Sequence, residues 1–135
     1  MKVSELKLTN FNQREFTVHA YHLAPITGLK KPRRPLAIVV PGGSFNHLSQ
    51  REGEPVALAF ASHGFQAAVM EYNLVQDPGQ IYPDAALDVL STINYSRQHA
   101  EEEEIDPQQI VVIGFSAGGH VVAIANNFAT DSNLA

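Results

Sequence analysis

Residues 111–121 read VVIGFSAGGHV, an apolar run followed by a serine between two glycines. A short run of β-branched residues is typical of a buried strand, and glycines allow a sharp turn after it. Apolar residues then recur at i, i+3, i+4 and i+7, which predicts a helix over residues 117–128. The stretch therefore predicts a strand, a tight turn that carries Ser116 and a helix, the repeating unit of a parallel α/β sheet.

Two more apolar runs lie upstream, so that the chain contains LAIVV at residues 36–40, FQAAVM at 65–70 and IVVIG at 110–114. Unbroken apolar runs are typical of parallel strands that are covered on both faces. The segment DPQQ at residues 106–109 predicts a turn that leads into the third run. Three parallel strands are therefore predicted.

Helical spacing fills both gaps between these runs. In the first gap, Pro55 suits the first turn of a helix and Gly64 its C-terminal stop. In the second gap, the pattern begins after Pro83 and Asp84 and ends near His99, before an acidic run that would oppose the helix dipole. The positions at helical spacing are Val56, Ala59, Phe60 and His63 in the first gap, and Ala86, Val89, Leu90 and Ile93 in the second.

The N-terminal segment has a different period. Residues 15–22 alternate between apolar and polar side chains, and residues 3–8 do so more weakly, which predicts two strands joined as an antiparallel hairpin. A length of 135 residues suits one domain. The predicted fold class is α/β, with one domain over residues 1–135 in which an antiparallel edge hairpin precedes parallel strands and their crossover helices.

The turn at Ser116 has the pattern G-x-S-x-G between a strand and a helix. So tight a turn brings Gly114 and Gly118 together, where side chains would clash. It would strain the serine backbone and raise its hydroxyl at the carboxyl end of the sheet. A serine becomes a nucleophile when a base removes its proton, and the resulting oxyanion needs preorganised donors. Ser116 is therefore the candidate nucleophile.

A second glycine loop, PGGSFN at residues 41–46, follows the first parallel strand. Gly42 and Gly43 would let the backbone approach a ligand closely and turn its N–H groups inward. We expect one oxyanion donor from this loop and another from the N–H of Ala117. A phosphate-binding loop is disfavoured, because no lysine follows in the pattern that such loops use.

Five segments carry a family resemblance: PGGSF, REGEPVALAFASHGF, EYNLV, YPDAALDVL and DPQQIVVIGFSAGGH. They resemble α/β-hydrolase esterases, especially the carboxylesterase and acetylxylan-esterase-like group related to the hormone-sensitive lipase type. The resemblance covers residues 36–128 and implies an α/β-hydrolase fold. It implies that Ser116 is the nucleophile and that the backbone N–H groups of Gly43, Ser44 and Ala117 hold the oxyanion. Pro41 stands where the stricter lipase pattern has histidine, and Ser44 where it has glycine.

The same resemblance implies hydrolysis of carboxylic esters through an acyl-enzyme, with no cofactor and no metal. The implied substrates are short-chain or acetyl esters, with sugar esters among the candidates. Two alternatives stay open on the sequence. A serine peptidase of the prolyl-oligopeptidase type uses a similar turn, and a non-catalytic binding protein can keep the fold without a working triad.

The other members of a catalytic triad are expected elsewhere, because the family order is serine, then acid, then histidine. After Ser116 the sequence contains one histidine and one aspartate, His120 and Asp131. His120 lies about one helical turn into the next helix, a poor position for taking the serine proton. We therefore expect the N-terminal half of a longer hydrolase, with its acid and histidine outside this sequence and the strand before Ser116 exposed at the sheet edge.

Composition disfavours several other classes. The net charge is −5 and the basic cluster KKPRR is short, which argues against a nucleic-acid partner. The chain has no cysteine and no long apolar run, which argues against thiolate chemistry and a membrane span. His19 and His22 would lie on opposite faces of a strand, which disfavours a metal site. We expect a cytoplasmic protein that acts on a small-molecule ester and is a candidate homo-oligomer.

Overall fold

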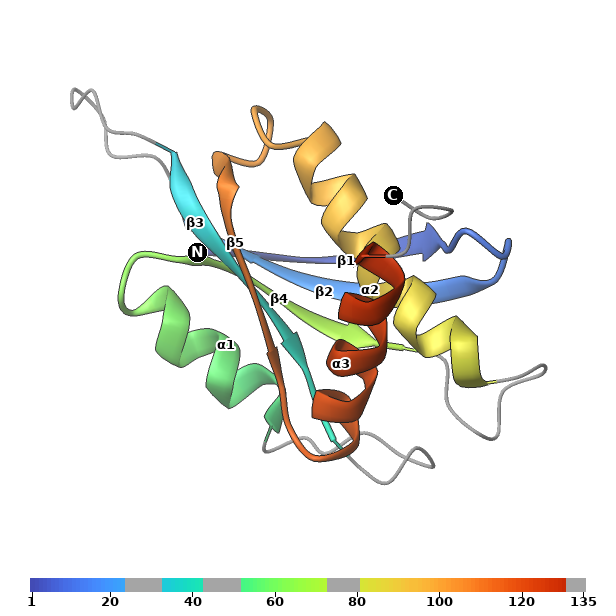
Figure 1. Ribbon diagram of the computed structural model, residues 1–135. Coiled ribbons are helices and arrows are strands. Elements are labelled where there is room, and N and C mark those ends of the chain that lie inside the picture. The colour runs from blue at the N-terminus through green and yellow to red at the C-terminus, as the bar shows by residue number, and fades with distance from the viewer. Residues whose placement is uncertain (24–32, 43–51, 73–80, 131–135) are drawn as a thin grey trace.

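The computed structural model describes residues 1–23, 33–42, 52–72 and 81–130. In this part of the chain, five strands form one sheet in the order β1-β2-β4-β3-β5, and three helices pack against it (Figure 1). The strands are β1 (Lys2–Thr9), β2 (Glu15–His22), β3 (Arg34–Val40), β4 (Gln66–Glu71) and β5 (Ile105–Gly114). The helices are α1 (Glu54–Ala61), α2 (Ile81–Gln98) and α3 (Ala117–Thr130). Strand and helix alternate after β3, which confirms the predicted fold class.

The sheet is mixed. β1 and β2 form the predicted antiparallel hairpin, and β2 also pairs antiparallel with β4. β3 pairs parallel with β4 on one side and with β5 on the other. Residues 37–40 of β3 are completely buried. The three apolar runs are thus neighbouring parallel strands, as the sequence predicted.

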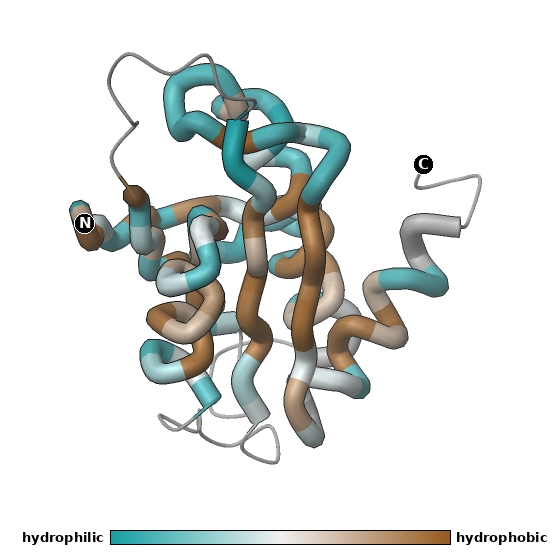
Figure 2. The backbone as a smooth tube through the Cα atoms, turned by 90° about the vertical axis from the view of Figure 1, so that its left-hand side faces the viewer, coloured by the Kyte–Doolittle hydropathy of each residue, from teal (hydrophilic) through white to brown (hydrophobic). Residues whose placement is uncertain are grey.

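Helices on both faces of the sheet explain why β3 is apolar throughout. α1 lies on one face, while α2 and α3 lie on the other (Figure 1). Because side chains alternate along a strand, Ile38 packs with the buried residues of α2 and α3, whereas Val39 packs with Ala57 of α1. Figure 2 shows the strands in the middle of the view as hydrophobic along much of their length.

The predicted turn at residues 106–109 is wrong, because these residues lie inside β5. Pairing with β3 continues on both sides of the segment, with a shift of register between the two pairings. The flanking pairs are Arg34 with Ile105 and Leu36 with Ile110. Within the segment, the carboxylate of Asp106 accepts a hydrogen bond from the N–H of Gln108 at 2.9 Å, as in an Asx turn. The turn chemistry is present, but it produces an irregularity within the strand.

The helix ends lie close to their predicted positions. α2 begins at Ile81, earlier than predicted, so Pro83 falls in its first turn, where a missing N–H breaks no helical hydrogen bond. At the end of α1, Gly64 has φ +90° and its N–H donates to the carbonyl oxygen of Ala61 at 3.0 Å, which confirms the predicted stop. None of the described helices is long and apolar enough to cross a membrane.

β5 forms the edge of the described sheet opposite β1. Val111 in the middle of this strand is 44% exposed. The exposed edge predicted for the strand before Ser116 is therefore present among the described residues.

A buried amide ties the turn of the β1–β2 hairpin to α2. The side-chain N–H₂ of Asn10 donates to the carboxylates of Asp88 at 2.8 Å and Asp84 at 3.2 Å. Its carbonyl oxygen accepts hydrogen bonds from the backbone N–H groups of Asn12 and Arg14. Asn10, Asp84 and Asp88 are all buried. One side chain thus orders the turn and supplies hydrogen bonds to two buried carboxylates, a role that the sequence analysis did not predict.

We expect Asn10→Ala to lower the free energy of unfolding by about 1–3 kcal/mol, because buried carboxylates lose a donor. The matched control is Asn94→Ala, which removes an exposed asparagine of α2 and should change stability by less than about 0.5 kcal/mol. Urea denaturation of both variants tests this prediction. Equal effects would contradict it.

Candidate active site

The turn between β5 and α3 holds Ser116 in the left-handed region of backbone conformation, with φ 49°. For a residue other than glycine this region costs about 1–3 kcal/mol, so the surrounding structure must hold the serine there. The N–H of Phe115 donates to the carbonyl oxygen of Val40 at 3.1 Å, and the N–H of His120 donates to that of Ser116 at 3.1 Å. The strained turn expected from the sequence is present, and Ser116 is exposed.

The position of this turn in the fold favours binding of a ligand with developing negative charge. Ser116 follows the carboxyl end of β5 and precedes the first residue of α3. Open α/β sheets bind ligands at the carboxyl ends of their parallel strands. The N-terminus of a helix adds N–H groups without intrahelical partners and the positive end of the helix dipole.

No side chain fits at either glycine of the turn. A Cβ on Gly114 would lie 2.6 Å from the carbonyl oxygen of Gly118. A Cβ on Gly118 would overlap the carbonyl oxygen of Val40 and lie 2.7 Å from that of Pro41. Real Cβ atoms essentially never come within 3.0 Å of such atoms. The first turn of α3 therefore crosses the end of β3 at backbone contact, which glycine alone allows.

We expect Gly118→Ala to lower the free energy of unfolding by about 1–3 kcal/mol or more, because backbone must shift to make room. Gly119→Ala is the matched control in the next position. Among the described residues, its Cβ would come closest to the carbonyl oxygen of Gly114, at 3.5 Å, which is an ordinary contact. Alanine there should stabilise α3 by up to about 1 kcal/mol. Denaturant unfolding of the pair checks the prediction, and a tolerated Gly118→Ala would refute it.

The second glycine loop begins against the serine turn. β3 and β5 are neighbouring parallel strands in which Val40 pairs with Gly114, so the loops that follow leave the sheet side by side. A Cβ on Gly42 would lie 2.6 Å from the carbonyl oxygen of Phe115 and 3.1 Å from the Cβ of Ser116. The structure thus brings the two glycine segments together at Gly42.

Of the three predicted oxyanion donors, only Ala117 lies in the described part of the structure. Ala117 is the first residue of α3, a position where the N–H has no partner within the helix. Gly43 and Ser44 lie outside the described residues. Their predicted role stays a prediction.

Two side chains to which the sequence analysis gave no role hold the start of the second loop. The carboxylate of Glu52 accepts a hydrogen bond from the N–H of Gly42 at 2.9 Å. The hydroxyl of Tyr72, which is 2% exposed, donates to the carbonyl oxygen of Pro41 at 2.6 Å. Burial, and secondly the charge of Glu52, raise the pKa of Tyr72 to about 12. Both residues belong to segments that carry the family resemblance, but neither contact leaves a periodic signal in the sequence.

The raised pKa of Tyr72 predicts a loss of stability in alkaline solution. Its ordinary pKa is 10.0, so the stabilisation is complete below pH 10 and is lost as the pH rises toward 12. We expect Tyr72→Phe to flatten this decline of the free energy of unfolding, as measured by urea denaturation across that pH range. Part of the slope should remain, because the pKa of Tyr21 is also raised to about 12. An unchanged slope in Tyr72→Phe would rule out Tyr72 as a cause of the decline.

The two histidines of β2 have different partners. His19 Nε2 lies 2.7 Å from a carboxylate oxygen of Glu71, and His22 Nε2 lies 3.9 Å from one of Glu103. The two histidines are three residues apart on one strand and therefore point to opposite faces of the sheet, as predicted. No group of three or more side chains that could hold a metal ion comes together in the described part of the chain. Asp131 lies outside the described residues.

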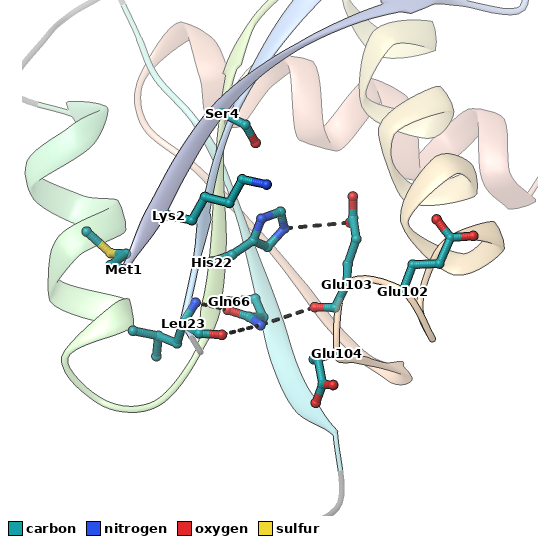
Figure 3. A pocket seen from close by; sticks show the side chains of 9 residues that line it. All are labelled: Met1, Lys2, Ser4, His22, Leu23, Gln66, Glu102, Glu103 and Glu104. Carbon is teal, nitrogen blue, oxygen red and sulfur yellow. Dashed lines mark hydrogen bonds and ion pairs between the residues drawn. The ribbon is translucent and has the colours of Figure 1, made fainter. Parts of the chain in front are cut away.

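A hollow of about 760 Å³ lies at the other end of the parallel strands (Figure 3). Residues at the start of β1 and β4 line it, together with acidic residues of the turn before β5. The side chain of Gln66 donates to the carbonyl oxygen of Glu103 at 3.1 Å and accepts from the N–H of Leu23 at 2.7 Å. Ten residues of β5 separate this end of the sheet from the turn at Ser116. The hollow is therefore distinct from the serine site.

Comparison with known families identifies the chain. A model of the BD-FAE family matches residues 25–135. The chain belongs to the BD-FAE family. Its fold matches the carboxylesterase Cest-2923 from Lactobacillus plantarum, with a TM-score of 0.91 and 34% identity over 99% of this chain. It also matches an acetyl ester-xyloside bifunctional hydrolase from Caldicellulosiruptor lactoaceticus, with a TM-score of 0.72 and 34% identity over 82% of this chain. Esterase LipC from Mycobacterium tuberculosis is 34% identical over 98 residues, or 72% of this chain.

The BD-FAE chain spans less than half of each of these proteins: 49% of Cest-2923, 38% of the bifunctional hydrolase and 24% of LipC. Over that span its fold is that of an α/β hydrolase. The resemblance to carboxylesterases and acetylxylan-esterase-like hydrolases that the sequence indicated is therefore confirmed.

Proposed function

We propose that this chain contributes the nucleophile to a serine carboxylic-ester hydrolase. The observation that carries the proposal is Ser116 at φ 49° in a turn packed against the second glycine loop at Gly42. A serine that merely joined a strand to a helix would need neither the strain nor the neighbouring loop. Relatives named as a carboxylesterase and an esterase support the same reaction.

In the proposed reaction, the hydroxyl oxygen of Ser116 attacks the ester carbonyl carbon while a general base takes its proton. The backbone N–H groups of Gly43, Ser44 and Ala117 hold the oxyanion, and the dipole of α3 favours the same charge. The alcohol leaves with the proton from the base, and an acyl-enzyme remains. Water then attacks the acyl group, releases the acid and restores the serine.

The base and its orienting carboxylate come, in this proposal, from residues outside this sequence. In this type of hydrolase the acid and the histidine follow the serine in chain order. His120 occupies the first turn of α3, and the backbone N–H of this histidine donates to the carbonyl oxygen of Ser116. The small share of each relative that the chain spans leaves ample sequence for an acid and a histidine in the whole protein.

We infer that the substrates are acetyl and other short-chain esters, including esters carried by sugars. The name of the relative that hydrolyses acetyl ester and xyloside supports this class. The net charge of −5 argues against an anionic polymer such as nucleic acid as the partner.

The complete protein that carries this sequence should hydrolyse p-nitrophenyl acetate, and Ser116→Ala should lower kcat on the order of 10³-fold or more. The control is Ser62→Ala, which removes an exposed serine at the end of α1 and should leave kcat unchanged. A fluorophosphonate should add its mass to the wild-type protein and not to Ser116→Ala. Full activity in Ser116→Ala would exclude this serine as the nucleophile.

Two further outcomes separate the alternatives. Faster cleavage of an aminoacyl amide than of the ester would indicate a peptidase of the prolyl-oligopeptidase type. Absence of both activities, together with no fluorophosphonate adduct, would favour a binding protein that keeps the hydrolase fold.

A further inference from the structure

Both polar atoms of a single peptide group are held at the start of the second glycine loop. The carbonyl oxygen of Pro41 and the N–H of Gly42 belong to the same planar peptide. The hydroxyl of Tyr72 donates to that oxygen at 2.6 Å, and the carboxylate of Glu52 accepts from that N–H at 2.9 Å. The two side chains come from different parts of the chain, one before α1 and the other after β4.

The held peptide lies beside the proposed nucleophile. A Cβ on Gly42 would stand 3.1 Å from the Cβ of Ser116, so the two backbones are close. The next residue is Gly43, whose N–H is a proposed oxyanion donor. The N–H of Gly42 already donates to Glu52, so the oxyanion donors that this loop contributes beside that of Ala117 must come from residues farther along it.

We propose that Glu52 and Tyr72 are positioning residues that fix the Pro41–Gly42 peptide and thereby aim the following N–H groups at the oxyanion. This inference rests on the proposed function. Two successive glycines have wide conformational freedom, so a loop that carries them near its start needs an external constraint to hold its donors. Donors that are oriented before the reaction are among the largest contributions to catalysis of acyl transfer.

The role assigned to Glu52 depends on its oxygen and not on its charge. A carboxylate near a developing oxyanion opposes that charge, so electrostatics alone would make Glu52 unfavourable there. A glutamine in its place keeps an oxygen that can accept the N–H of Gly42. The conservative variant Glu52→Gln should therefore restore what Glu52→Ala loses.

A second tyrosine–glutamate pair provides matched controls. The hydroxyl of Tyr21 on β2 donates to the carboxylate of Glu54 at 2.8 Å. Glu54 is the first residue of α1, only two positions after Glu52. Tyr21→Phe and Glu54→Ala thus remove a hydroxyl and a carboxylate of the same kinds, but neither of the hydrogen bonds that hold the described part of the second glycine loop, Pro41 and Gly42.

The test measures kcat and KM of the complete protein with p-nitrophenyl acetate. We expect kcat to fall about 10- to 100-fold in Glu52→Ala and in Tyr72→Phe, because misplaced donors stabilise the transition state less well. KM should stay within about threefold of the wild-type value. Glu52→Gln should keep kcat within about threefold of the wild type, and both control variants should match the wild type. Hydrogen exchange of the Gly42 amide, followed by NMR, should be accelerated in Glu52→Ala and stay slow in Glu52→Gln.

In an active enzyme, the positioning role would be overturned if Glu52→Ala kept the wild-type kcat or if only KM changed. It would also be overturned if kcat fell as far in Glu52→Gln as in Glu52→Ala, or as far in the Tyr21 and Glu54 control variants. A wild-type protein that hydrolyses no ester would instead overturn the proposed function and, with it, the catalytic part of this inference. The exchange rate of the Gly42 amide distinguishes the two failures, because it reports the hydrogen bond without any need for activity.

Discussion

The backbone of α3 touches the end of β3 at Gly118, and the geometry around Ser116 depends on this contact. The helix starts so close to β3, the middle one of the three parallel strands, that a Cβ on Gly118 would overlap the carbonyl oxygen of Val40. The short path from β5 to α3 then leaves the serine a left-handed backbone conformation, which the hydrogen bond from Phe115 to Val40 stabilises. The turn can form in this closely packed region because its glycines carry no side chains.

The second glycine loop follows from the same sheet topology. β3 lies between β4 and β5, so its carboxyl end lies directly beside the serine turn that follows β5. Gly42 fits there because it has no Cβ to collide with Phe115. Backbone groups from two neighbouring strands thus meet at one point, and the side chains of Glu52 and Tyr72 come from farther away to orient them. Proposed chemistry that depends on N–H groups needs such external supports, because two successive glycines leave the backbone wide conformational freedom.

The parts of this structure that were predictable are those that repeat along the chain. Burial on both faces of β3 leaves an unbroken apolar run, and one buried face leaves helical spacing in α1, α2 and α3. The turn was predictable because close backbone contact demands glycine at fixed offsets from Ser116. Single polar contacts were not, since Asn10 meets Asp88 across 78 positions without any periodic pattern. At residues 106–109 the local turn signal was overridden by pairing with β3, which continues on both sides.

The strand order has a consequence for synthesis of the chain. β3 is the most deeply buried strand of the sheet, yet its two parallel partners, β4 and β5, follow it in sequence. While the protein emerges from the ribosome, the segment LAIVV therefore lacks its first partner until residue 71 has been made and its second until residue 114. An apolar strand that is exposed for that interval can pair with other nascent chains. The arrangement that shields β3 most completely in the folded protein thus leaves its apolar segment unshielded during part of translation.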